Sequence, residues 1–216
     1  MDTLRSIVTF FVDGGPFMYP ILVVMAVGFA IAIERYITLT LVRRRNDIMW
    51  NKLQPALANG EFEQARDMTG KDDSTVSRLL GMGLARQGAV RRREDIEIAM
   101  EEVMMEIIPQ LEKRTAYVAL GANIATLLGL LGTIIGLIQG FQAVSNANPA
   151  EKADLLSASI SVAMNTTAFG LIVGIPLLVT HSVLVAKTAE IVDSLEMASV
   201  KTLNVITTAA KRLVAA

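Results

Sequence analysis

The chain has 216 residues, of which 52% are hydrophobic and 19% are charged, and its formal net charge is −1 at pH 7. This balance excludes a protein that binds nucleic acid through bulk positive charge. The absence of cysteine excludes disulfide bonds and thiolate metal ligands, and a single histidine, His181, excludes zinc motifs built on paired histidines.

The charged residues are unevenly distributed along the chain. Three stretches contain no Lys, Arg, Asp or Glu: residues 14–33, 115–150 and 155–186. A helix that crosses a bilayer needs about 20 apolar residues, because each residue adds about 1.5 Å across about 30 Å of hydrocarbon. The sequence therefore predicts an all-α integral membrane protein. Its three expected transmembrane helices cover residues 17–41, 117–142 and 160–186.

The first apolar stretch lies close to the N-terminus, where a secretory signal peptide would also lie. The residues before it carry mixed charges, with Asp2, Arg5 and Asp13, and arginines follow the apolar run. This order and the length of the run favour a signal anchor that remains in the protein over a cleaved signal peptide.

Basic residues flank the expected spans on one side of the membrane: Arg43, Arg44, Arg45, Lys113, Arg114 and Lys187. Lys and Arg near the ends of spans are enriched on the cytoplasmic side. We therefore expect residues 42–116 and 187–216 to be cytoplasmic, and residues 1–16 and the 143–159 loop to face outward.

The expected cytoplasmic segments contain helical patterns. Apolar residues recur every three or four positions, as on one helical face, at Ile96, Met100, Val103, Met104, Ile107, Ile108 and Leu111. A similar stripe follows Lys187, at Ile191, Leu195, Ala198, Thr202, Val205 and Ala209. The second and third spans should therefore extend into the cytoplasm as long helices, with a kink at Pro109. Residues 46–90 should form shorter helices joined by turns.

Small residues recur at intervals of three or four in the second and third spans: Gly129, Gly132, Gly136, Gly170 and Gly174. This spacing predicts close helix–helix packing, because small residues let helices approach within a bilayer. One face of the second span should carry Asn123, Thr126, Gly129, Thr133, Gly136 and Gly140. The Thr133 hydroxyl then either bonds across the helix contact or lines a path for an ion.

The third span contains adjacent Thr166 and Thr167. They cannot face the same way, so one of them should bond to its own helix backbone. His181 lies about 21 Å beyond Thr167 and within about 40° of its direction on the helix. A histidine at a span end usually packs at the interface, and a proton-relay role needs a partner group.

The second and third spans contain no Asp or Glu. A proton or sodium pathway normally needs a carboxylate, so if this chain conducts ions, another chain must supply that group. Snorkelling or mutual neutralisation explains Glu34-Arg35 at the inner edge of the first span. The sequence lacks Gly-x4-Gly-Lys-Ser/Thr, and we expect no enzymatic activity and no cofactor.

Two motifs resemble those of a known family. The segment LGLLGTIIGLI at residues 128–138, followed by Phe141, resembles the second-span motif of the ExbB/TolQ/MotA proton-channel family, and TTAFGLIVGIP at residues 166–176 resembles its third-span motif. Glu34-Arg35 resembles a pair common at the end of the family's first span. The likeness covers essentially the whole chain, and the three expected spans favour the ExbB/TolQ branch over four-span MotA.

The resemblance implies an inner-membrane motor subunit that forms a homopentameric helical ring. The second and third helices would surround the single helices of an ExbD/TolR-type partner, whose Asp takes up and releases a proton. Thr133 and Thr167 correspond to the family's pore threonines, Thr166 is a further candidate for lining the pathway, and His181 is a candidate for its cytoplasmic end. A TonB- or TolA-like protein would transmit the work, and the two outward segments would be periplasmic.

Departures from the family pattern leave the subfamily open. Ala125-Thr126-Leu127 stands where the family often has Pro, Ser157–Ser161 where it often has Glu or a Gly-containing helix entry, and Thr180-His181 where it often has Asn. TonB-type uptake, Tol-type envelope function and gliding or stator motors remain alternatives. Sodium coupling through threonine and serine oxygens and a passive membrane scaffold are further alternatives.

Overall fold

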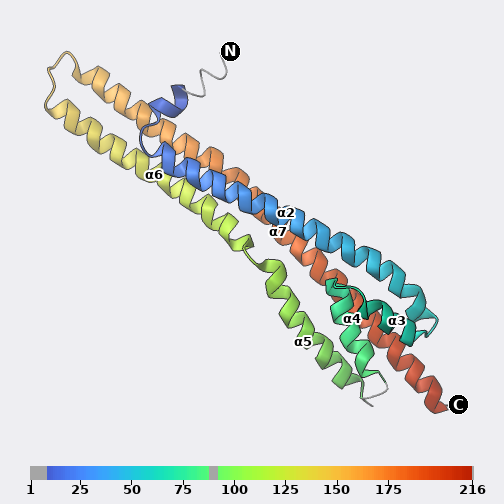
Figure 1. The fold of residues 1–216 in the computed structure, drawn as a ribbon. Helices are drawn as coiled ribbons and strands as arrows, with labels where there is room; N and C mark the ends of the chain where they lie inside the picture. Colours follow the sequence, from blue (N-terminus) through green and yellow to red (C-terminus); the bar gives the residue numbers. More distant parts are fainter. Residues whose placement is uncertain (1–8, 88–91, 216) are drawn as a thin grey trace. The chain divides into compact units, whose positions relative to one another are not determined.

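The computed structural model describes residues 9–87 and 92–215, with side chains up to residue 209, and these residues form helices joined by short turns (Figure 1). Residues 9–13 are helical. The longer helices are α2 (Met18–Ala58), α3 (Phe62–Gly70), α4 (Thr75–Arg86), α5 (Arg93–Glu112), α6 (Thr115–Ser145) and α7 (Lys152–Ala215). The predicted all-α fold is confirmed. The described residues do not include Asp2 and Arg5, which were cited above for the signal anchor, or residues 88–90 of the 46–90 segment.

Three helical stretches are long and apolar enough to cross a membrane, one in α2, one over α5 and α6, and one in α7. They contain the predicted spans 117–142 and 160–186 and all of 17–41 except Phe17, because α2 begins at Met18. The turn between α6 and α7 covers residues 146–151, so both helices continue beyond the predicted spans into the 143–159 segment. The depth at which each helix enters the bilayer remains a prediction.

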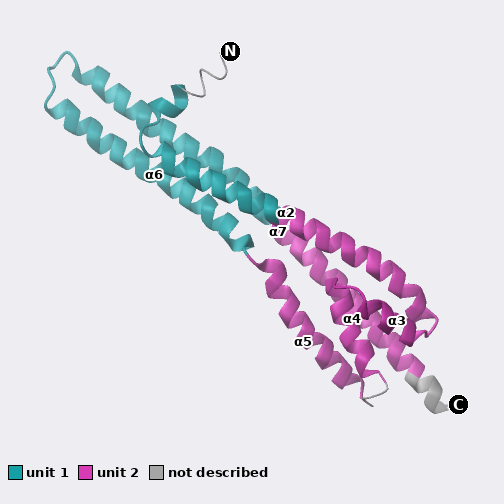
Figure 2. Ribbon diagram, in the orientation of Figure 1, with its two compact units in different colours: residues 1–34, 114–183 teal, residues 35–113, 184–216 magenta. Residues whose placement is uncertain are grey.

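The chain folds into two compact units (Figure 2). The first, called the membrane unit here, contains residues 1–34 and 114–183. The second, called the cytoplasmic unit here after the location expected from the sequence, contains residues 35–113 and 184–216. Each unit has its own core.

Where α6 meets α7, the membrane unit packs mainly through small side chains, although the unit also fully buries Met18 and Ile21 of α2 and Leu177 of α7. The buried residues of α6 are Thr115, Val118, Ala122, Ala125, Gly129, Gly132 and Gly140. Asn123 and Thr126, which we expected on the same face as the glycines, are exposed. Close packing of helices in lipid requires small residues, so the buried face of α6 contains mainly Ala and Gly, and the Asn123 side chain stays exposed.

The cytoplasmic unit packs through large apolar side chains. Its fully buried side chains include Leu39, Leu53, Leu79, Leu80, Leu84, Met100, Ile107, Leu184 and Ile191. The predicted stripe on α5 is buried except for Ile108, which is half-buried, and the first four positions of the stripe after Lys187 are buried. Both predicted amphipathic patterns therefore form core faces.

The long helix through the second span is interrupted between α5 and α6. Pro109 lies inside α5, and the helical course ends at Lys113 and Arg114. Arg114 has a φ of 65°, in the left-handed region that non-glycine residues rarely adopt. The interruption thus follows the expected kink at Pro109 by one turn.

The helix α2 continues the first span without interruption to Ala58, where we expected separate shorter helices.

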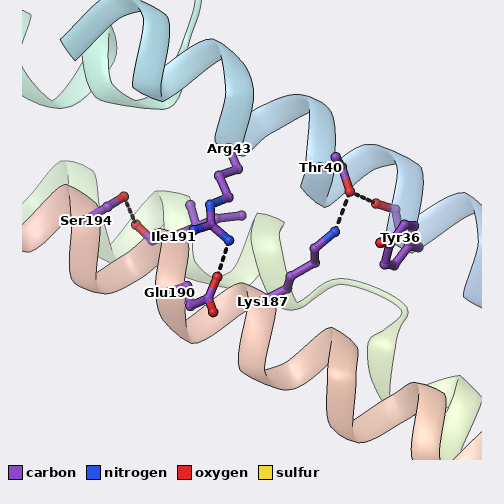
Figure 3. Close-up of polar contacts among 7 residues, drawn as sticks. All are labelled: Tyr36, Thr40, Arg43, Lys187, Glu190, Ile191 and Ser194. Atoms are coloured by element: carbon purple, nitrogen blue, oxygen red, sulfur yellow. Dashed lines mark hydrogen bonds and ion pairs between the residues drawn. The ribbon is translucent and has the colours of Figure 1, made fainter. Parts of the chain in front are cut away.

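Polar contacts join α2 and α7 in the cytoplasmic unit (Figure 3). Lys187 Nζ lies 3.6 Å from the centroid of the Tyr36 ring and donates to Thr40 Oγ1 at 2.5 Å. Arg43 and Glu190 form an ion pair whose side chains are half-exposed. Lys187, cited above only as a marker of orientation, therefore also contributes a cation–π contact between helices.

Candidate functional site

The backbones of α6 and α7 approach most closely at Gly129 and Gly170. A Cβ on Gly170 would lie 2.7 Å from the Ala125 carbonyl oxygen and 3.0 Å from Gly129 Cα. A Cβ on Gly129 would lie 3.2 Å from Gly170 Cα. No side chain fits at Gly170 without separating the backbones, and a methyl group at Gly129 would push them apart by a few tenths of an ångström, so glycine on both helices permits this approach.

Other predicted glycines lie along the same contact. A Cβ on Gly136 would lie 3.2 Å from Ala163 Cβ, and one on Gly174 would lie 2.5 Å from Thr126 Oγ1. Gly132 faces the methyl group of Thr166. The structure therefore places all five predicted packing glycines where α6 and α7 run antiparallel.

Thr133 and Thr167 meet at this contact. Their hydroxyl oxygens are hydrogen-bonded to each other, and each hydroxyl also lies 3.1 Å from the Gly129 carbonyl oxygen. Thr133 Oγ1 is a further 3.4 Å from the carbonyl oxygen of Ala163. Each hydroxyl has one proton to donate and two lone pairs. The two hydroxyl oxygens and the carbonyl oxygens of Gly129 and Ala163 therefore share only two hydroxyl protons.

The two threonines are half-buried within the chain, so their hydroxyls lie at the edge of the helix contact. Nearby side chains of α6 and α7 are large, apolar and exposed, among them Leu130, Ile134, Met164 and Leu171. Threonine hydroxyls do not ionise near neutral pH, and these spans carry no carboxylate. The pair can bind and orient a proton-carrying group but cannot take up the proton itself.

Thr166 lies apart from this pair. Its hydroxyl oxygen is 2.6 Å from the carbonyl oxygen of Gly14 and 2.9 Å from that of Val162 in its own helix. Thr166 is 1% exposed. As expected for adjacent threonines, one of the two bonds to its own helix backbone.

His181 is half-buried on α7, and the structure does not bring it to the threonine pair. Among the described residues its ring makes no hydrogen bond and no ion pair. Glu34 and Arg35 also have separate partners, since Glu34 lies 3.9 Å from Arg114 and buried Arg35 donates to the Leu111 carbonyl.

The sequence analysis missed the turn around Gly14 and Phe17, which lies against the α6–α7 contact. Gly15 in this turn has a φ of +74°, and the Gly14-Gly15-Pro16 segment is the signal that predicts a turn here. Its docking site on α7 depends on residues more than 140 positions away, which no local pattern reveals.

Comparison with known proteins agrees with this geometry. Residues 71–197 match the MotA/TolQ/ExbB proton channel family. The chain belongs to this family. The matched region contains the glycine contact and both pore-threonine candidates, and together with three apolar helices it identifies a membrane protein.

The chain is also similar in sequence to individual members of the MotA/TolQ/ExbB family. The chain is 28% identical over 195 residues to a homologue of the biopolymer transport protein ExbB from Methanothermobacter thermautotrophicus, an alignment covering 89% of this chain and 67% of the relative. It is 29% identical over 111 residues to the biopolymer transport protein ExbB of Aquifex aeolicus, covering 51% and 72%. It is 32% identical over 84 residues to the Tol-Pal system protein TolQ of Haemophilus influenzae, covering 39% and 36%.

Proposed function

We propose that this chain is the channel subunit of an inner-membrane complex that couples proton flow to mechanical work in the periplasm or at the outer membrane. The observation that carries the proposal is the half-exposed pair of Thr133 and Thr167 on an apolar face without a carboxylate. A single-span partner of the ExbD/TolR type supplies the missing intramembrane Asp. A TonB- or TolA-like protein transmits the work.

The threonine pair suits contact with such an Asp. An ionised carboxylate in low dielectric needs hydrogen-bond donors, whereas a protonated one donates to an acceptor. A threonine hydroxyl serves both states, because it donates through its proton and accepts through its lone pairs. The two hydroxyl protons are shared between the Gly129 carbonyl and the bond that joins the two hydroxyls, and they would turn to the carboxylate when it arrives ionised.

Assembly into a ring follows from the same face. Copies of the chain, five in the family's arrangement, would place α6 and α7 around the partner helices and cover the exposed apolar side chains with protein and lipid. We assign the N-terminus to the periplasm and the C-terminus to the cytoplasm, because the basic residues at the span ends follow the positive-inside distribution.

Proton uptake into liposomes that contain the chain and its co-purified partner tests the function. Thr133→Val and Thr167→Val should each lower the flux at least about tenfold, the loss of about one charge-assisted hydrogen bond, while the oligomer stays intact on size exclusion. Thr180→Val is the matched control, since the Thr180 hydroxyl donates to the Pro176 carbonyl of its own helix. Unchanged flux in the Thr133→Val, Thr167→Val double variant would contradict the proposal and favour a passive scaffold.

Sodium is the second candidate for the coupling ion. Two threonine hydroxyls and the carbonyl oxygens of Gly129 and Ala163 lie together, and oxygen ligands suit hard cations. Flux that depends on sodium concentration at constant pH would favour this candidate. Flux that depends on the pH gradient in sodium-free buffer would exclude it.

A further inference from the structure

A turn at residues 14–17 connects the helical residues 9–13 to α2. Gly15 adopts a φ of +74°, which glycine tolerates without strain. The amide of Met18 donates to the Gly15 carbonyl at 3.2 Å, and the Met18 side chain is fully buried. The turn is therefore held within the membrane unit by its own hydrogen bond and by packing.

Thr166 of α7 binds this turn through its hydroxyl. Its oxygen lies 2.6 Å from the Gly14 carbonyl oxygen, closer than the 2.9 Å to Val162 in its own helix. The hydroxyl has one proton, so the two carbonyls share it, and the shorter contact reaches the turn. Because Thr166 is 1% exposed, water does not compete for this hydrogen bond.

Two further contacts hold the turn and the helical residues before it against α6 and α7. Phe17 Cβ lies 3.2 Å from the place where a Cβ on Gly132 would stand, and the Thr166 methyl group contacts the same place. The ring of Phe11 meets the ring of Phe169 edge-on, with centroids 5.7 Å apart. Phe169 lies one turn along α7 from Thr166, so the aromatic contact and the hydrogen bond act on one face of the helix.

Thr167 follows immediately and is directed to a different side of α7. Successive residues of a helix differ in direction by about 100°. Thr167 donates to the Gly129 carbonyl of α6, whereas Thr166 donates to Gly14. These two hydrogen bonds hold α7 from two directions at one level, so a rotation of α7 about its axis strains at least one of them.

We propose that Thr166 is a positioning residue, whose hydroxyl ties the 14–17 turn to α7 and so fixes the direction of the Thr167 hydroxyl. The tie follows from the contacts within the membrane unit, and its effect on ion flow rests on the function proposed above for Thr167. Burial and the bond to Gly14 give Thr166 this role in place of the pathway-lining role suggested by its position beside Thr167.

Hydrogen–deuterium exchange of the intact complex tests the tie. Thr166→Val keeps the shape of the side chain but removes the hydroxyl, and it should speed amide exchange over residues 14–18 about tenfold, the equivalent of one lost hydrogen bond. Thr166→Ser should retain the wild-type exchange, as should Thr180→Val on the same helix. Wild-type exchange in Thr166→Val would overturn the proposal.

The pH profile of proton flux tests the positioning effect. A misdirected Thr167 hydroxyl stabilises the partner's ionised carboxylate less, so Thr166→Val should move the midpoint about half a unit toward higher pH, and Thr166→Ser should restore it. A shifted midpoint without faster exchange would make Thr166 a pathway residue and overturn the proposal, as would faster exchange with an unshifted midpoint. If the wild-type complex carries no proton flux, the function proposed above fails, and the exchange measurement alone decides whether the tie exists.

Discussion

The α6–α7 contact of the membrane unit and the core of the cytoplasmic unit use different packing chemistry, although α7 contributes to both. At the contact with α6, α7 buries Ala163, Thr166 and Gly170, and it also buries Leu177 in the membrane unit. In the cytoplasmic unit it buries Leu184 and Ile191. Water drives large apolar side chains together, at about 25 cal/mol per Å² removed from solvent. Lipid provides no such force, so close backbone approach and hydrogen bonds between helices hold the α6–α7 contact together.

The largest expected effect concerns the cytoplasmic core. Leu80→Ala removes a fully buried side chain of α4 and should lower the local free energy of unfolding by about 2–5 kcal/mol. Amide exchange over α4 and α5 measures the change. Ile98→Ala on α5, where the side chain is 60% exposed, should change it by less than about 0.5 kcal/mol. Similar losses in both variants would show that burial does not stabilise this unit.

A smaller loss is expected when a single methyl group is added to the membrane unit. Gly170→Ala places a Cβ 2.7 Å from the Ala125 carbonyl oxygen, a backbone atom that cannot move without separating the helices. We expect a destabilisation of about 1–3 kcal/mol, read from the detergent or heat resistance of the purified oligomer.

Gly70→Ala provides the matched control for this variant. A Cβ on Gly70 meets nothing within 4 Å, so the change should be neutral or stabilise α3 by up to about 1 kcal/mol. Equal behaviour of the two alanine variants would contradict the difference in packing between the units.

The smallest expected effect is a pH dependence confined to the cytoplasmic unit. Hydrogen bonds from Ser74, the largest contribution, and from Ser77 lower the pKa of Asp72 below its usual range, against the opposing effect of partial burial. A carboxyl whose folded pKa is depressed stabilises the fold above its unfolded pKa and loses this contribution as the pH falls through the folded value. Exchange over α4 should therefore accelerate below about pH 4.

Asp72→Asn isolates this effect. It should remove the pH dependence at the N-terminus of α4, where Asp72 accepts from the Ser74 amide at 3.0 Å and the Ser77 hydroxyl at 2.8 Å. The exchange of amides in α6 should not follow the same titration, because the hydroxyls and carbonyls of that contact do not ionise. A loss of protection in α6 with the same midpoint would show that the two units unfold together.

Much of this fold could be predicted because its signals are local. Charge-free runs predict spans, and the spacing of Ile96, Met100 and Ile107 predicts which side of α5 is buried. The break at Arg114 could not be predicted, because its left-handed conformation has no glycine to mark it. The buried face of α6 was predicted only in part, since helical periodicity does not say whether Asn123 or Ala122 turns toward α7.

The sequence by itself determined that the chain is an all-α membrane protein, which glycines allow close packing, and that no carboxylate lies in the second and third spans. Only the tertiary structure decided that Thr133 and Thr167 share the Gly129 carbonyl while Thr166 turns to Gly14. The physical reason is distance along the chain. Composition and periodicity act within a helix, whereas the partner of a hydroxyl 152 positions away depends on how separate helices pack.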